Sequence, residues 1–241
     1  MQPEYHADRG GVNAYHFVDK LTENLDDDAI IVTDVGFCFI PTFQSLRLKE
    51  GQRLIHSAGV SPMGWGIPAA VGAAMAAPGR QVVCLTGDGG AMMNIQELAT
   101  IAHHKLPISI FVFENGGYAT MKITQNNHFK REVMSGPQTG VGMPDFFGLA
   151  VAFGLSSHCI HNHGGLEKLL SFVLADGKKK PTFVSMRMAP DQVIKPRVQA
   201  RTENGKFVPT PIDDMWPFIP RDDFTITEDA NINDSRVDAG G

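Results

Sequence analysis

The sequence has little cysteine and no long apolar run. Its 241 residues hold three cysteines at wide spacing, Cys38, Cys84 and Cys159. An odd number at such spacing indicates neither a disulfide framework nor a paired-cysteine metal site. No apolar run reaches the roughly 20 residues of a membrane-spanning helix, and residues 1–11 are too polar for a secretory signal. We therefore expect a cytoplasmic protein without a membrane partner.

An excess of basic residues is also absent. The 21 lysines and arginines are outnumbered by 26 aspartates and glutamates, which gives a net charge of −5. This balance gives no reason to expect a nucleic-acid partner. Hydrophobic residues make up 43% of the chain and charged residues 20%, which is the composition of an ordinary globular domain. The length predicts one domain with a tail.

Short apolar runs alternate with amphipathic segments between residues 12 and 188. Strands are expected at 29–33, 53–56, 81–86, 108–113, 157–160 and 182–188. Helices are expected at 12–25, 37–46, 67–77, 94–104, 145–154 and 166–175, with a partly helical stretch at 118–129 and a surface loop at 131–144. This alternation predicts an α/β fold, a six-stranded parallel sheet with helices on both faces.

The segments outside this pattern set the expected boundaries. Residues 1–11 are expected to be a linker or arm, and 12–188 a single domain. Residues 189–224 lose the periodicity, contain six prolines and are expected to form an extended C-terminal arm. Residues 225–241 are polar and acidic, a composition typical of a disordered tail.

Two strand ends in the middle of the chain carry the most informative residues. Gly87-Asp88-Gly89-Gly90 follows the strand at 81–86, and Asn115 follows the strand at 108–113, 27 residues after Asp88. Parallel strands that follow one another through a helix end at the same edge of a sheet, where α/β proteins bind ligands. A carboxylate and a carboxamide are therefore expected side by side.

Those two groups suit a particular ligand. Hard oxygen ligands of this kind bind Mg²⁺, which takes its other ligands from phosphate and water. Glycines near the start of a helix present N–H groups to phosphate. The pattern favours a diphosphate held through a divalent cation. Either glycine motif alone is also a common turn, so the spacing of the pair carries the argument.

The Gly-Asp-Gly with a downstream Asn resembles the thiamine-diphosphate signature. Residues 94–101 and 64–74 also resemble the corresponding segments of acetolactate synthases. The resemblance spans about residues 13–188 and covers the C-terminal, diphosphate-binding domain of acetolactate synthases and 2-oxo acid decarboxylases. It implies two cofactors, thiamine diphosphate and Mg²⁺.

The resemblance also assigns roles. It implies that Asp88, Asn115 and the main-chain carbonyl of Gly117 hold the metal. It implies cofactor binding by Gly36, Phe37, Ser61, Met63, Gly87, Asp88, Gly89, Gly90, Asn115, Gly117 and Tyr118. The bulky Met63 would support the bent cofactor, and the carbonyl of Ser61 would accept from its amino group. Core packing is the other reading of Met63, and a plain turn is the other reading of Gly36.

One catalytic part is missing from this stretch. Enzymes of this family use a glutamate from a pyrimidine-binding domain, and no region here resembles that domain. The resemblance therefore implies a partner subunit or domain with that fold, in a homo- or hetero-oligomer. The activity it implies is decarboxylation of a 2-oxo acid, with release of an aldehyde or transfer to a second carbonyl. Such an enzyme is a lyase or a transferase.

Other functions stay open. The tryptophan of acetolactate synthases in the substrate pocket aligns near Thr124 here, so the donor and acceptor substrates are not specified. A subunit of a 2-oxoacid oxidoreductase lacks support because no cysteine cluster is present. A regulatory or scaffold subunit that keeps the fold without the chemistry is a further alternative. The Gly-x-Gly-x-x-Gly pattern of a nucleotide-binding oxidoreductase is absent.

Overall fold

The structure is a computed structural model that describes residues 3–7, 9–190, 192–203 and 206–218. The chain divides into two compact units, residues 1–192 and 193–241. The first unit contains the whole expected domain. The expected tail at 225–241 lies outside the described residues, as do residues 219–224.

A six-stranded parallel sheet forms the centre of the first unit, as the alternating pattern predicts. Its strands lie in the order β2-β1-β3-β4-β6-β5, and every neighbouring pair is parallel. The strands are β1 (Ile30–Thr33), β2 (Arg53–Ile55), β3 (Val82–Gly87), β4 (Ile108–Glu114), β5 (Ser156–Ile160) and β6 (Thr182–Arg187). β2 and β5 lie at the two edges.

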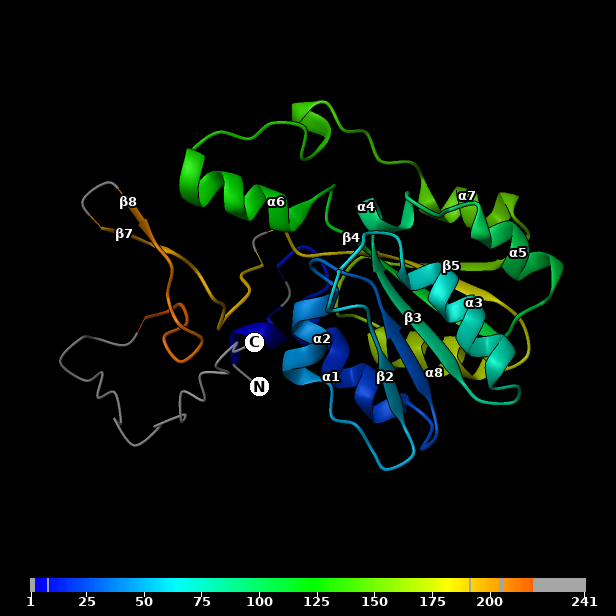
Figure 1. The fold of residues 1–241 in the computed structure, drawn as a ribbon. Helices are drawn as coiled ribbons and strands as arrows, with labels where there is room; N and C mark the ends of the chain where they lie inside the picture. The colour runs from blue at the N-terminus through cyan, green and yellow to red at the C-terminus, as the bar shows by residue number, and fades with distance from the viewer. Residues whose placement is uncertain (1–2, 8, 191, 204–205, 219–241) are drawn as a thin grey trace, which may run out of the picture. The chain divides into compact units, whose positions relative to one another are not determined.

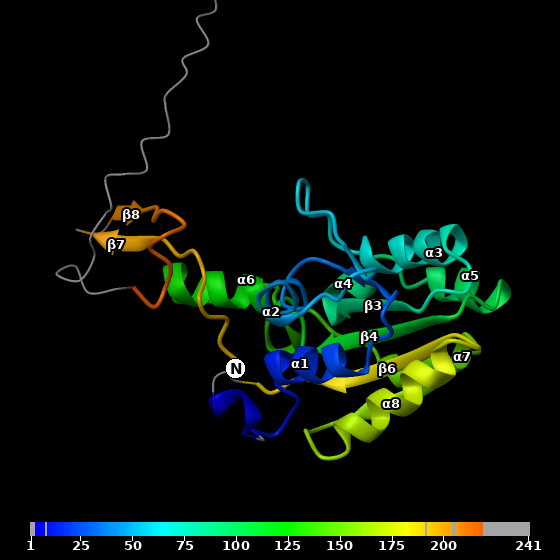
Figure 2. The ribbon, with the colours of Figure 1, turned by 90° about the horizontal axis from the view of Figure 1, so that it is seen from below.

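Helices cover both faces of this sheet (Figure 1). α3 (Gly66–Ala76) lies on one face, and α1 (Ala14–Asn24) and α8 (Leu166–Gly177) lie on the other, as the view from below shows (Figure 2). The remaining helices are α2 (Phe39–Ser45), α4 (Asp88–Ala91), α5 (Glu97–His103), α6 (Ala119–Thr124) and α7 (Phe146–Ala152). The first unit thus has the three layers of a doubly covered parallel sheet.

Burial explains why the strands are nearly continuous apolar runs. β1 is buried at all four positions and β4 at its first six, because a parallel sheet covered on both faces leaves neither set of side chains in water. Ile30, Val32 and Cys84 pack in one cluster with the inner faces of α3 and α5. Phe17 of α1 contacts Phe111 and Phe113 on the opposite face, with ring centroids 5.2 and 5.4 Å apart.

The largest departure from the expected elements follows β3. One long helix is expected at 94–104, but the chain forms the four-residue helix α4 directly at Asp88 and begins α5 only at Glu97. The stretch 118–129 is α6 continued by a π-helical turn at Gln125–Phe129. A 3₁₀ turn at Pro137–Thr139 interrupts the expected loop at 131–144, and Ser135 within it is buried.

The segments at the two ends also contain local structure. Pro3–His6 forms a 3₁₀ turn within the expected N-terminal arm. In the second unit, β7 (Arg201–Glu203) pairs antiparallel with β8 (Lys206–Val208). Arg201 and Asp214 form a buried ion pair at 2.6 Å. The stretch expected as an extended arm therefore includes a short, tied hairpin.

Candidate functional site

The site lies where the direction of the strand order changes. From β1 the chain moves outward to β2, whereas from β3 it moves the other way to β4. The crevice between β1 and β3 is thus a topological switch point, the usual ligand position in open α/β sheets. β1 ends before Asp34, β3 ends before Asp88, and β4 ends before Asn115.

Asp88 is the buried centre of this edge, with 1% of its surface exposed. Its Oδ1 accepts the backbone N–H of Gly89 and its Oδ2 that of Gly117, both at 2.8 Å. The Asn115 carboxamide turns toward the same point. Its inward terminal atom lies 3.2 Å from Asp88 Oδ1 and 2.6 Å from the Gly117 carbonyl oxygen. The three groups expected to hold a metal therefore converge.

This convergence fits a hard divalent cation. With its nitrogen inward, Asn115 donates to the Asp88 carboxylate and to the Gly117 carbonyl, which satisfies both oxygens without a ligand. With its oxygen inward, a carboxylate, a carboxamide and a carbonyl oxygen face one another, an arrangement that needs a positive charge. Three protein oxygens with open remaining positions are the donor set that Mg²⁺ uses beside phosphate.

Burial changes the acidity of this carboxylate. It raises the pKa of Asp88 to about 6, against the hydrogen bonds from Gly117, Gly89 and Gly116, which lower it. The nearby charge of Glu114 raises the pKa of Asp88 further. A bound cation would oppose these effects by stabilising the charged form.

The glycines of the expected diphosphate site differ in what their amides do. The N–H groups of Gly89 and Gly117, expected to face phosphate, already donate to Asp88. In this structure they hold the carboxylate, and their contact with a cofactor stays a prediction. Gly36 adopts φ +93° in the loop that follows β1, and the side chain of Phe37 beside it is buried.

The loop after β2 presents Met63 to the outside. Its side chain is 40% exposed, which excludes the alternative that it packs in the core. Ser61 takes the left-handed conformation, φ 49°, and its N–H donates to the carbonyl of Ser57 at 2.7 Å. A non-glycine residue in this conformation is uncommon. Residues 57–61 thus form a hydrogen-bonded turn, and the exposed Met63 follows it.

Tyr118 closes the other side of the site. Its backbone N–H donates to Ser135, and its ring lies against Gly89, where an added Cβ would meet the ring at 2.4 Å. Gly89 is thus required for this contact. The contact with Gly89 keeps the Tyr118 ring next to the ends of β3 and β4.

Asp34 is a site residue that the sequence analysis does not identify. It follows β1, is 1% exposed and lies beside Gly90, where an added Cβ would be 2.9 Å from its Oδ2. Its position in the sequence is a usable signal, because an aspartate directly after a buried parallel strand lies at the same edge of the sheet as Asp88.

Other polar groups lie away from this edge. Gln125 makes two hydrogen bonds at 3.0 Å with the backbone of Val133, so its amide ties the π-helical turn to the following loop. His163 accepts the N–H of Asn13 at 2.9 Å and stacks on His16. In the described part of the chain, no group of three His, Cys, Asp or Glu side chains is placed to hold a metal ion.

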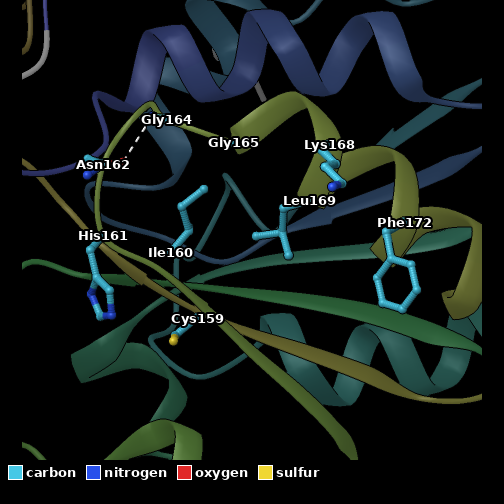
Figure 3. A pocket seen from close by; sticks show the side chains of 9 residues that line it. All are labelled: Cys159, Ile160, His161, Asn162, Gly164, Gly165, Lys168, Leu169 and Phe172. Carbon is cyan, nitrogen blue, oxygen red and sulfur yellow. Dashed lines mark hydrogen bonds between the residues drawn. The ribbon is translucent and has the colours of Figure 1, made fainter.

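A separate hollow of about 460 Å³ lies between β5 and α8 (Figure 3). Ile160, Leu169 and Phe172 line it, with Gly164 and Gly165 in the preceding loop. It contains none of the expected site residues. None of the described helices is long and apolar enough to cross a membrane.

Comparisons with known proteins agree with this geometry. Residues 34–186 match the family model "Thiamine pyrophosphate enzyme, C-terminal TPP binding domain". The chain is 31% identical over 194 residues to the acetolactate synthase isozyme 1 large subunit of Escherichia coli, an alignment that covers 80% of this chain and 34% of that protein. It is 35% identical to the acetolactate synthase large subunit of Parasynechococcus marenigrum, over 78% of this chain and 30% of the relative.

A solved structure supports the same fold. The thiamine diphosphate-dependent 4-hydroxybenzoylformate decarboxylase of Rhodococcus jostii superposes with a TM-score of 0.67 at 27% identity, over 76% of this chain and 33% of that one. The chain thus spans about a third of the length of the relatives it matches. By the family match, the fold and the position of its strand ends, the chain belongs to the thiamine pyrophosphate enzymes, as their C-terminal TPP-binding domain.

Proposed function

We propose that this chain binds thiamine diphosphate through Mg²⁺ and forms half of the active site of an enzyme that decarboxylates a 2-oxo acid. The observation that carries the proposal is the convergence of Asp88, Asn115 and the Gly117 carbonyl at one point. The family match names the cofactor, and the donor set fits the cation that joins a diphosphate to protein oxygens.

Each residue of the chain has a distinct task in this proposal. Asp88, Asn115 and the Gly117 carbonyl hold the cation, while the N–H groups of Gly89 and Gly117 keep the carboxylate in place. The cofactor, when bound, supplies the electron sink for loss of the substrate carboxylate. The accessible Met63 supports the ring system from the loop after β2, and the Ser61 carbonyl accepts a hydrogen bond from its amino group.

The other half of the site comes from a pyrimidine-binding domain with a catalytic glutamate, on this or another subunit. Exposed apolar side chains in the loop after β2 and directly after α4 support this part, and the two segments are neighbours, because an added Cβ at Gly64 would lie 2.5 Å from Met93 Cβ. Val60 is 85% exposed, Met93 48%, Met63 40% and Met92 39%. Such a group of exposed apolar residues is typical of a surface that another domain covers.

The acceptor of the reaction is the less defined part. The named acetolactate synthases favour transfer to a second carbonyl, and the named decarboxylase favours release of an aldehyde. The second candidate is a scaffold subunit without chemistry. The convergence of Asp88, Asn115 and the Gly117 carbonyl argues against it, because a scaffold has no need to bring these three groups together.

Calorimetric titration tests the proposal. Thiamine diphosphate with Mg²⁺ is titrated into the chain, alone and with a pyrimidine-binding domain supplied, beside Asp88→Ala. We expect binding that needs Mg²⁺ and is lost in Asp88→Ala. Asp27→Ala is the matched control, since Asp27 is a surface carboxylate paired with Lys49, and it should bind as the wild type does.

Two results would decide against the proposal. If no binding occurs with the pyrimidine-binding domain present, the cofactor assignment is wrong and the scaffold alternative is favoured. Equal binding by Asp88→Ala and wild type would place the cation elsewhere.

A further inference from the structure

Asp34 is a buried carboxylate that the proposed metal site does not use. It lies directly after β1 and is 1% exposed, although burial of an unpaired charge is costly. Among the described residues, no lysine or arginine forms an ion pair with it. Its charge must therefore be balanced by hydrogen-bond donors.

The two donors that bond its side chain lie at the ends of β1 and β3. Asp34 Oδ1 accepts the N–H of Val35 at 2.7 Å, and Oδ2 accepts the Thr86 hydroxyl on β3 at 3.0 Å. Burial raises the pKa of Asp34, while these two bonds and the N–H groups of Gly66 and Gly64 lower it. The carboxylate thus connects the ends of β1 and β3.

Close packing shows the same connection. An added Cβ at Gly66 would lie 2.9 Å from Asp34 Cβ, and one at Gly90 would lie 2.9 Å from Asp34 Oδ2. Neither position has room for a side chain. Asp34 is therefore enclosed between the loop before α3 and the turn that follows Asp88.

A second bond holds the same loop from the other side. Asn94 Nδ2 donates to the Gly64 carbonyl at 2.8 Å, and Gly64 itself adopts φ +80°. Gly66 of the loop thus packs against Asp34, and the Gly64 carbonyl faces Asn94. The exposed Met63 immediately precedes the anchored Gly64.

We propose that Asp34 is a positioning residue that holds the Met63 loop at a fixed distance from the diphosphate turn. The inference rests on the proposed function, because it concerns the two parts of the chain that would contact opposite ends of the cofactor. Asp34 does not touch the cofactor in this proposal. It acts by accepting hydrogen bonds at the ends of β1 and β3 and by packing against Gly66 of the loop.

The chemistry of the acceptor gives a sharp test. Both groups that bond Asp34 donate to it in this structure, so Asp34→Asn removes the negative charge and replaces one acceptor oxygen by an amide nitrogen. Loss of hydrogen bonds to a buried charged group should weaken binding of thiamine diphosphate with Mg²⁺ by about tenfold or more. Inorganic diphosphate with Mg²⁺, which does not reach Met63, should lose about threefold or less.

Hydrogen exchange adds a readout that needs no ligand. In Asp34→Asn, amide exchange in residues 57–66 should rise by about tenfold or more, while β4 and β6 keep their protection. Thr86→Val keeps the carboxylate and removes one donor, and should give the same pattern at smaller size. Thr86→Val also tests the proposal if Asp34→Asn does not fold.

A control of equal stability separates positioning from general loosening. Leu170→Val alters the buried core under α8, away from the site, and is compared at a urea concentration that gives equal stability. We expect it to leave the ratio of the two affinities unchanged. The proposal is overturned if Asp34→Asn raises exchange evenly across the unit, or weakens both ligands equally.

The wild-type titrations distinguish this inference from the proposed function. If the wild type with a pyrimidine-binding domain binds neither ligand, the proposed function fails and this inference fails with it. If the wild type binds both and Asp34→Asn leaves their ratio unchanged, only the role of Asp34 is wrong.

Discussion

Gly117 donates its backbone N–H to Asp88 Oδ2 over 2.8 Å while its own carbonyl faces Asn115. One peptide therefore holds the carboxylate with its donor and offers its acceptor to the same centre. This requires φ +118° at residue 117, a conformation that only glycine adopts without strain. The geometry of the site thus depends on a residue that has no side chain.

Gly117→Ala should remove the site. The added Cβ would lie 2.4 Å from the Ser135 carbonyl oxygen, in addition to the strain at positive φ. We expect a loss of about 2 kcal/mol or more in the free energy of unfolding, together with loss of Mg²⁺-dependent cofactor binding. Urea unfolding and calorimetry measure the two effects.

Gly116→Ala is the control for this prediction. Its φ is +75°, but the nearest atom to an added Cβ is Lys122 Nζ at 3.9 Å, so it bears only the conformational cost of about 1–2 kcal/mol. Equal losses of binding in the two variants would show that the contact with Ser135 is unimportant.

Gly89→Ala should be relieved by a change at Tyr118. An added Cβ at residue 89 would meet the Tyr118 ring at 2.4 Å, so overpacking should cost about 1–3 kcal/mol. Combined with Tyr118→Ala, the same change should cost clearly less. A double-mutant cycle of unfolding free energies gives the coupling, and strict additivity would contradict the predicted contact.

Stability without metal should depend on the ionisation of Asp88. Its pKa is raised from 3.8 to about 6 in the folded chain, so the folded state binds more protons between these values. The contribution of Asp88 to the free energy of unfolding should therefore be present below about pH 4 and fall as the pH rises through 6, by roughly 3 kcal/mol at most.

The difference between wild type and Asp88→Asn across pH 4–7 measures this contribution, because other titrating groups occur in both. Added Mg²⁺ should stabilise the wild type above about pH 6 and lose its effect below it, since the cation competes with a proton. A wild-type curve parallel to that of Asp88→Asn would contradict the raised pKa.

Asp214→Ala should loosen the second unit alone. Asp214 is 1% exposed and pairs with Arg201 at 2.6 Å, while the Arg201 guanidinium also lies over Phe218 at 4.0 Å. Breaking a buried pair by removing one partner costs about 3–5 kcal/mol, more than a hairpin of this size retains. Limited proteolysis should then cleave within 193–218, and residues 12–188 should keep their unfolding midpoint. Protection equal to wild type at the hairpin would contradict a structural role for the pair.

Much of the sheet was predictable because its strands are buried on both faces. In the segment 12–25, expected as a helix, the apolar residues at helical spacing are all buried, although the helix itself spans Ala14–Asn24. They are Val12, Tyr15, Val18, Leu21 and Leu25. The meeting of Asp88 and Asn115 also follows from the strand–helix–strand order, which makes β3 and β4 parallel neighbours. The roles of these residues with a cofactor stay predictions.

Contacts that depend on backbone atoms were not predictable. Helix α4 starts at Asp88 in a glycine-rich stretch of low helix propensity, and it is held by the strand end and by packing. The position of Asp34 after a buried strand is visible in the sequence, but its partners are not, because Thr86 on β3 and Gly66 at the start of α3 lie more than 30 residues away. The amides of Gly89 and Gly117 face a side chain rather than an open site, which spacing alone does not reveal.

The position of β6 has a consequence for the order in which the first unit is made. β6 lies between β4 and β5, and β5 pairs with no other strand of this sheet in the described residues. On the ribosome, β5 emerges before the strand it needs, so it must wait until residues 182–187 follow. During that interval the edge of β4 that later pairs with β6 is open. Strands β1, β3 and β4 can already pair with one another, and their carboxyl ends carry the candidate site. The half of the sheet with the candidate site is therefore able to assemble during synthesis before the other half closes.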